Sequence, residues 1–275
     1  MGSFAEFVDV RSKEPLRQGD VLQATDSSAI KWQRHLLVIT ADCDFAYAKH
    51  QGRVTCIPLL TADEYLMEFH VPKIRDRLVK KPLQLLQTSL RTAGIKNLTS
   101  ARVRQWILED GADAAISSLS LAGAELSSAA EAIRAIELID SLASNTTLAA
   151  EALVDAQLIG SNPPKRVNAV ETVAAPLREA FLRPPGDAMF LSSIGRDHRQ
   201  GYFAYLRHLE QVWEREISTG PTNREMKYRR ISRVQDRFTH ALVQKFGMVF
   251  MSIGLPTEYE EMRDLHADLV KVGLE

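Results

Sequence analysis

Two acidic residues that flank a cysteine form the most unusual short motif of this sequence. Asp42, Cys43 and Asp44 follow an apolar run that ends at Thr40. Two carboxylates and a thiol can bind a divalent metal, but such a site needs further ligands. Those ligands could come from His35, His50, His198 or His208.

The same motif has two other interpretations. The aspartates can cap a turn while Cys43 packs inward as a small apolar side chain, or the turn can contact a ligand or a protein partner. The acidic neighbours disfavour the thiolate that a catalytic cysteine needs. We keep Asp42, Cys43 and Asp44 as a ligand or partner turn and expect no metal and no cofactor.

Basic residues that can contact a phosphate backbone occur in two segments. They are Arg196, His198, Arg199, Arg229 and Arg230. The first three fall in a turn flanked by glycines, and the last two belong to a basic run that also contains an aromatic residue. Proteins bind single-stranded RNA with this combination of side chains. A solvated hairpin tip and a charged strand edge explain the same residues without RNA.

The composition is that of a globular protein, with 45% hydrophobic and 25% charged residues among 275. The net charge of −1 gives no overall attraction to nucleic acid or to an anionic membrane, so any RNA contact must be local. No apolar run approaches the roughly 20 residues that span a bilayer, and the first ten residues lack a signal-peptide core. We therefore expect a cytoplasmic protein without a membrane role.

Strand-like runs occur near both ends of the chain. Residues 20–23, 35–40 and 53–60 predict a short meander, and residues 189–191, 202–206 and 209–213 predict further strands. The continuous apolar character of 35–40 and 53–60 favours strands that are covered on both faces. Since neither group has enough strands to be stable alone, we expect the two groups to pair in one sheet or barrel.

Helical spacing dominates the middle of the chain. Thr99 and Ser128 are placed to begin helices there, and an amphipathic helix over 238–253 should end at 254–256. The predicted fold class is α+β, with one small β barrel built from both chain ends and a large all-α insertion. The predicted boundaries are 1–65, 66–186 and 187–275, with the final helix in the last part.

Four segments, taken in this order, resemble the MazF/PemK family of toxins. They are Arg17-Gln-Gly-Asp-Val21, Arg34-His-Leu-Leu-Val-Ile-Thr40, Val54-Thr-Cys-Ile-Pro-Leu-Leu-Thr61 and Arg230-Ile-Ser-Arg-Val234. The resemblance covers about a hundred residues in two pieces. It implies an SH3-like barrel of the kind that cuts single-stranded RNA without a metal.

The resemblance also implies two catalytic residues, Arg34 and Thr61. An arginine can stabilise the charge of the transition state, and a threonine hydroxyl can contact a phosphate oxygen. The chain departs from the family at His35, where relatives carry proline, and in the helical segment that follows Thr61. Four acidic residues near these positions should repel RNA: Asp42, Asp44, Asp63 and Glu64.

Two functional classes remain. The first is a MazF-like regulatory or binding protein of a bacterial stress or anti-phage defence system, which holds a protein partner through its helical region. Related barrels include toxins of toxin–antitoxin pairs and a helical-extended, CRISPR-associated regulator. The alternative is a metal-independent endoribonuclease acting on single-stranded RNA through Arg34 and Thr61. The resemblance leaves homodimerisation open, and the acidic surroundings favour the first class.

Overall fold

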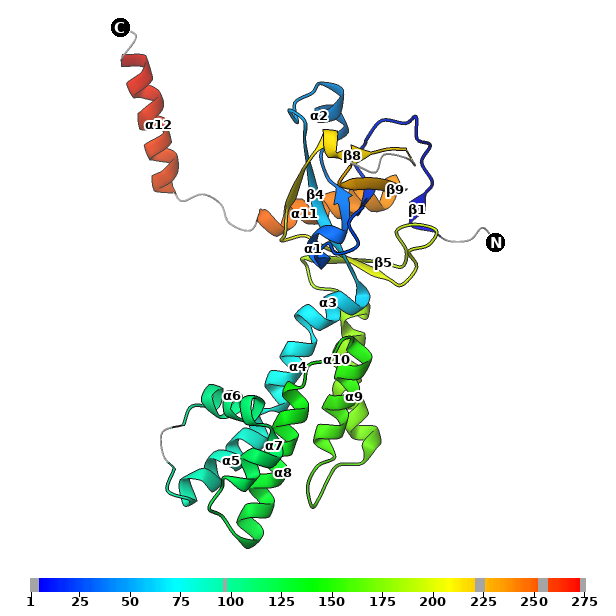
Figure 1. Cartoon of the computed structure of the whole chain (residues 1–275). Helices are drawn as coiled ribbons and strands as arrows, with labels where there is room; N and C mark the ends of the chain where they lie inside the picture. Colours follow the sequence, from blue (N-terminus) through cyan, green and yellow to red (C-terminus); the bar gives the residue numbers. More distant parts are fainter. Residues whose placement is uncertain (1–4, 96–97, 221–225, 252–256, 273–275) are drawn as a thin grey trace.

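The chain folds into a curled sheet at one end and a group of helices at the other (Figure 1). The computed structural model describes residues 5–95, 98–220, 226–251 and 257–272. Within them the class is α+β, as predicted, and the sheet forms an antiparallel half-barrel apart from one short parallel pair.

The described strands come from both ends of the chain and share one sheet. They are β1 (Phe7–Val8), β2 (Asp20–Ala24), β3 (His35–Val38), β4 (Arg53–Thr61), β5 (Ala188–Leu191), β6 (Tyr202–Tyr205), β7 (Glu210–Trp213), β8 (Ile217–Ser218) and β9 (Tyr228–Val234). Their order is β1-β9-β2-β3-β4-β6-β5, while β7 pairs with β4 and β8 with β9. The expected pairing of the two groups of strands is therefore confirmed.

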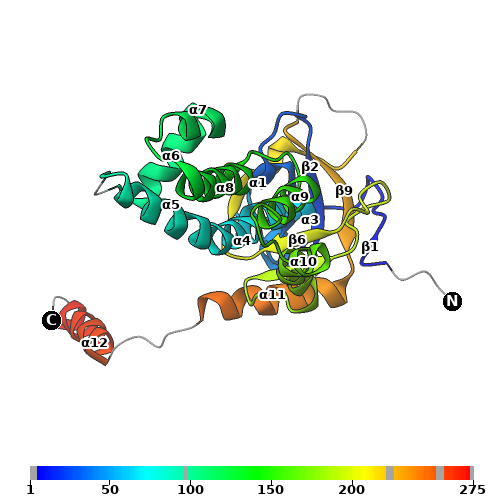
Figure 2. The ribbon, with the colours of Figure 1, turned by 90° about the horizontal axis from the view of Figure 1, so that it is seen from below.

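Helices fill the chain between β4 and β5. They are α3 (Ala62–Phe69), α4 (Val71–Leu78), α5 (Lys80–Thr92), α6 (Ser100–Asp110), α7 (Ala112–Ser117), α8 (Gly123–Asp140), α9 (Thr146–Gln157) and α10 (Arg166–Leu182). Seen from below, α9 and α10 lie under the strands, whereas α5, α6 and α7 extend to one side (Figure 2). None of the described helices combines the length with the apolar character that spanning a bilayer requires.

Of the two predicted helix starts in the middle of the chain, one is confirmed and one is wrong. Thr99 caps α6, because its hydroxyl accepts a hydrogen bond from the Arg102 backbone N–H at 3.3 Å. The expected start at Ser128 is wrong, since α8 begins five residues earlier, with a mostly exposed first turn. The remaining helices are α1 (Lys31–Arg34), α2 (Asp42–Ala46), α11 (Asp236–Phe250) and α12 (Thr257–Val272). The sequence did not predict α12, and the expected end of α11 at 254–256 lies outside the described residues.

Separate apolar cores support the helices and the sheet. The helical core contains buried side chains from Val71 to Val173 and none from the strands. The two faces of the sheet carry different clusters, with Leu37 and Ile57 in one and Leu36 and Val38 in the other. The strands β3 and β4 are thus covered on both faces, which confirms the interpretation of their continuous apolar runs.

A buried glutamate connects the two edge strands of the sheet. Glu6, just before β1, is 5% exposed, and its carboxylate accepts hydrogen bonds from the Ser192 backbone N–H at 2.9 Å and hydroxyl at 2.7 Å. Ser192 follows the last residue of β5. Since β1 and β5 stand at opposite ends of the strand order, this contact brings the ends of the curled sheet together.

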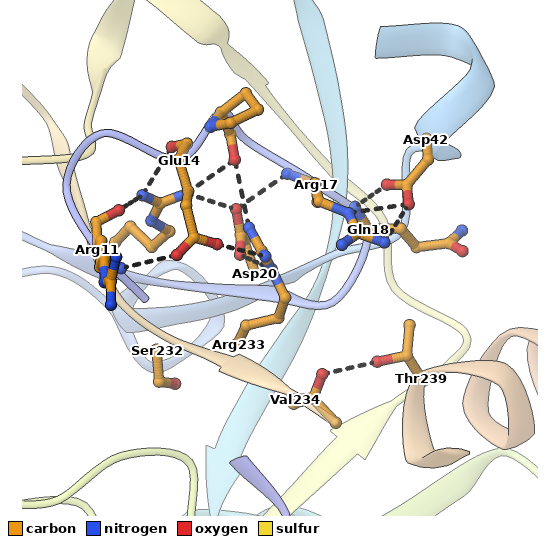
Figure 3. A network of polar contacts seen from close by, with 12 residues as sticks. Arg11, Glu14, Arg17, Gln18, Asp20, Asp42, Ser232, Arg233, Val234 and Thr239 are labelled. Carbon is orange, nitrogen blue, oxygen red and sulfur yellow. Dashed lines mark hydrogen bonds and ion pairs between the residues drawn. The ribbon is translucent and has the colours of Figure 1, made fainter. Parts of the chain in front are cut away.

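The turn before β2 is held by a buried ion-pair network (Figure 3). Asp20 is fully buried, and its carboxylate accepts hydrogen bonds from Arg230 at 3.1 Å and Arg233 at 2.6 Å. Gly19 adopts a positive φ of 91°, and a Cβ there would lie 2.6 Å from the Thr239 hydroxyl. The segment 17–21 is one of the four that resemble the toxin family. In the structure it is a turn whose contacts join β2 to β9.

Candidate functional site

The structure brings Arg34 and Thr61 together on either side of a third residue, Glu64. Arg34 ends α1, and Thr61 ends β4 and caps α3. The Glu64 carboxylate forms an ion pair with the Arg34 guanidinium and accepts a hydrogen bond from the Thr61 backbone N–H at 2.9 Å. The Thr61 hydroxyl accepts in turn from the Glu64 backbone N–H at 3.1 Å. These reciprocal bonds are a capping box.

This arrangement occupies the groups that would bind a phosphate. The Arg34 side chain is 42% exposed, whereas that of Glu64 is 16% exposed, so the carboxylate approaches the guanidinium from the protein side. The Thr61 hydroxyl already acts as a helix cap. An anionic ligand at Arg34 must therefore compete with the carboxylate of Glu64.

A layer of neutral polar rings lies beside this pair. His35 follows Arg34 directly and is 4% exposed, and neither of its ring nitrogens has a hydrogen-bond partner among the described residues. Its ring centroid lies 5.1 Å from that of His198 and 5.5 Å from that of Tyr202. The Tyr202 hydroxyl is 3.4 Å from His198 Nδ1, and Tyr202 pairs with Thr61 across the sheet.

The electrostatics keep these rings uncharged at neutral pH. Burial, followed by the charges of His198 and Arg34, lowers the pKa of His35 to about 4. Burial also lowers the pKa of His198, despite an opposing effect of Asp197. Burial and the Glu64 charge raise the pKa of Tyr202 to about 12. The site thus combines two neutral imidazoles and a phenol with an ion-paired arginine.

The motif at 42–44 lies in α2 and has other partners. Asp42 accepts hydrogen bonds from the Gln18 backbone N–H at 2.8 Å and from Arg17 Nη2 at 2.9 Å. Burial opposes ionisation of Asp42, but these bonds prevail and lower its pKa. Cys43 is exposed, so the expectation that it packs inward is wrong; its Sγ lies 3.8 Å from Asp44 Oδ1. Inward packing would require a buried position for the Cys43 side chain, and α2 has no buried residue.

Two of the four histidines that we considered as metal ligands bind glutamates, and His50 also contacts the motif through a backbone carbonyl. His50 contacts the Glu214 carboxylate at 2.8 Å and the Asp44 carbonyl at 3.0 Å, and His208 contacts Glu210 at 2.8 Å. The pKa of His50 is raised, first by its bond to Glu214. The described part of the chain contains no group of three or more side chains placed to hold a metal ion.

The five basic residues proposed for RNA do not form one surface. Arg196 is ion-paired with Asp9, and Arg199 is exposed. Arg230 is buried, with its side chain 2% exposed and bonded to Asp20 and to the carbonyls of the 11–15 loop. Arg230 is therefore part of the sheet's ion-pair network and is not available to RNA in this structure.

His198 and Arg229 do belong to the neighbourhood of His35. Arg229 donates to the Gln23 side chain at 2.9 Å, and Gln23 pairs in the sheet with both His35 and Arg229. The positive charge of Arg229 contributes to the lowered pKa of His198. Sequence reasoning missed Gln23 and Tyr202, because their proximity arises from strand pairings between opposite ends of the chain.

Comparisons of the chain with family models, with curated proteins and with solved structures found no match.

Proposed function

We propose that this protein is a MazF-like regulatory or binding protein whose sheet does not cut RNA while Glu64 holds Arg34. The observation that carries the proposal is the ion pair between these two residues. A catalytic arginine must meet the phosphate of the substrate, and here a carboxylate of the same chain occupies it. The setting that we propose is a bacterial stress or anti-phage defence system, and the compartment is the cytoplasm.

Features of the sheet support the MazF-like barrel and the helical insertion. The strands of both chain ends pair in one curled sheet, whose ends meet at Glu6 and Ser192. The helices α3 to α10 separate the two groups of strands and have their own apolar core. An SH3-like barrel interrupted by a helical domain is consistent with both observations.

The helical part offers a place for a protein partner. A surface cleft of about 480 Å³ lies among α4, α6 and the end of α8. Its lining residues are Pro72, Arg75, Asp76, Ala101, Arg104, Gln105, Leu108 and Asp140. Arg104 pairs with Asp140, whereas the guanidinium of Arg75 has only the Ser141 carbonyl as a partner among the described residues. A carboxylate of the partner would complete the bonding of Arg75.

The test is an RNA cleavage assay in EDTA. Wild type and Arg34→Ala are incubated with single-stranded RNA of mixed sequence, and size-exclusion chromatography confirms that both are folded. We expect no cleavage by the folded wild type. Cleavage by wild type that Arg34→Ala abolishes would overturn the proposal and establish the ribonuclease.

The ribonuclease remains the second candidate because of the rings beside Arg34. In that reaction a neutral His198 would accept the proton of the RNA 2′-hydroxyl as its oxygen attacks phosphorus. The bond between phosphorus and the 5′-oxygen breaks, the proton held by His198 passes to that oxygen, and a 2′,3′-cyclic phosphate remains. His198 lies within hydrogen-bond reach of Tyr202, and its lowered pKa keeps it able to accept a proton at neutral pH.

A further inference from the structure

The residues that join the sheet to the helices contact both parts through adjacent side chains. We name residues 61–64 the elbow. On the sheet side, the Ala62 backbone N–H donates to the Gly201 carbonyl at 2.8 Å, and Glu64 binds Arg34. On the helical side, the Asp63 carboxylate accepts from the Thr146 backbone N–H at 2.7 Å.

The helical contact of the elbow is specific to one helix end. Thr146 is the first residue of α9, and its hydroxyl also donates to the Asp63 carbonyl at 3.3 Å. A carboxylate at this end satisfies a backbone N–H that the helix itself leaves unbonded. A displacement of α9 relative to the sheet would therefore act on Asp63, and through the shared backbone on Glu64.

The rest of α3 is fixed on the sheet. Tyr65, the next residue, is buried and stacks on Phe203 of β6 with 4.1 Å between ring centroids. Glu68, one turn further along α3, forms an ion pair with Lys31 of α1. These contacts hold the rest of α3 on the sheet. A displacement of Asp63 would therefore change the backbone of the first turn, where the capping box is formed.

We propose that the elbow couples the helical part to the Arg34 site, with Glu64 as a built-in competitor for a phosphate of single-stranded RNA. When α9 holds Asp63, the first turn of α3 keeps Glu64 on Arg34. When a partner bound to the helices moves α9, Glu64 withdraws and the guanidinium becomes available. This inference rests on the proposed function, because it describes how the silent site is regulated.

Fluorescence anisotropy with a labelled single-stranded RNA of mixed sequence tests the coupling. The variants Asp63→Ala, Glu64→Gln and Glu68→Gln each remove one negative charge from the same helix, and only Glu64→Gln removes the carboxylate on Arg34. We expect Glu64→Gln to raise RNA affinity about tenfold and Asp63→Ala about threefold, while the control Glu68→Gln stays near wild type.

Two double variants complete the test. Arg34→Ala added to Glu64→Gln should return the affinity to the wild-type value. Asp63→Ala added to Glu64→Gln should give no further gain, because both act through one contact. Equal RNA affinities of Glu64→Gln and Glu68→Gln would contradict the proposal that Glu64 competes with RNA for Arg34. Additive gains in affinity in the Asp63→Ala, Glu64→Gln double variant would contradict the coupling through the elbow. RNA cleavage by wild type would overturn the proposed function instead. The ratios of RNA affinity between variants test the coupling separately, because they do not depend on cleavage.

Discussion

Asp20 is the residue on which the polar interior of the sheet depends most directly. Its carboxylate binds two arginines, and all three side chains are at most 8% exposed. Removing the charge of Asp20 leaves Arg230 with backbone carbonyls as its acceptors and Arg233 with Glu14 as its remaining carboxylate. Breaking a buried ion pair in this way costs more than the intact pair contributes.

We expect Asp20→Asn to lower the free energy of unfolding by about 3–5 kcal/mol. Asp42→Asn is the matched control, because Asp42 also pairs with an arginine but both side chains are nearly half exposed. The control should cost about 1 kcal/mol or less. Urea denaturation measures both, and equal losses would contradict the assignment of Asp20 to a buried network.

His35 should make stability depend on pH. Its folded pKa of about 4 lies below the ordinary 6.5, so the unfolded chain binds the proton more readily. Stability is then present above pH 6.5 and is lost as the pH falls toward 4. Between pH 7 and pH 5 the contribution of His35 to the unfolding free energy should fall by about 2 kcal/mol.

The check on His35 compares urea denaturation of wild type and His35→Phe at both pH values. The phenyl ring keeps the aromatic packing against His198 and Tyr202 but cannot bind a proton. The variant should therefore lose most of the pH dependence, with the remainder due to His198, whose pKa is lowered as well. An unchanged slope in the variant would show that His35 is not the group responsible.

The outcomes at single residues show what a pattern can and cannot predict. The choice of Arg34 and Thr61 as catalytic residues came from the family resemblance, and the structure places both beside Glu64. The assignment of Arg230 to RNA failed because a basic run does not reveal which side chains point inward. Alternation along β9 turns Arg229 outward and Arg230 toward Asp20.

At the level of elements, a contact between Glu6 before β1 and Ser192 after β5 joins the two ends of the curled sheet. Both strands are short, and each has a partner on one side only in the described strand order. The buried carboxylate of Glu6 substitutes for backbone pairing between them by accepting from Ser192 and from the Ser193 hydroxyl at 3.3 Å.

We expect Glu6→Ala to cost about 2 kcal/mol and to speed amide hydrogen exchange in β5 more than in β3. The control is Asp9→Ala, which removes a nearby acid whose ion pair with Arg196 is exposed. Hydrogen exchange with mass spectrometry measures both. Equal protection of β5 in Glu6→Ala and wild type would mean that the edge strands are held by other contacts.

Elements with a strong local pattern were predicted well, and those without one were not. The apolar runs of β3 and β4 determine strands by themselves, since both faces are buried. The start of α8 was misplaced because small residues around 123–128 neither cap nor break a helix clearly. The pairing of β4 with β6 depends on tertiary contacts across the helical segment, which periodicity does not encode.

For the whole molecule, the helices and the sheet have separate cores. We therefore expect a cavity in one core to destabilise only the part that contains it. Ile133→Ala in α8 removes a fully buried side chain of the helical core and should cost about 2–5 kcal/mol. Amide exchange should then accelerate in α5 and α8 but not in β2, β3 and β4. Leu37→Ala in β3 should give the reverse pattern. Acceleration throughout the chain in either variant would contradict the division at 66–186.

The ion pairs of Asp20 also set an order of events during synthesis on the ribosome. Asp20 and Arg233 are 213 positions apart. At synthesis rates of about 5–20 residues per second the Asp20 carboxylate therefore waits roughly ten to forty seconds for its partner. The helical core, from Val71 to Val173, is complete well before that moment and can fold first. The first strands meanwhile expose unpaired edges, which makes the nascent chain a substrate for chaperones until β9 emerges.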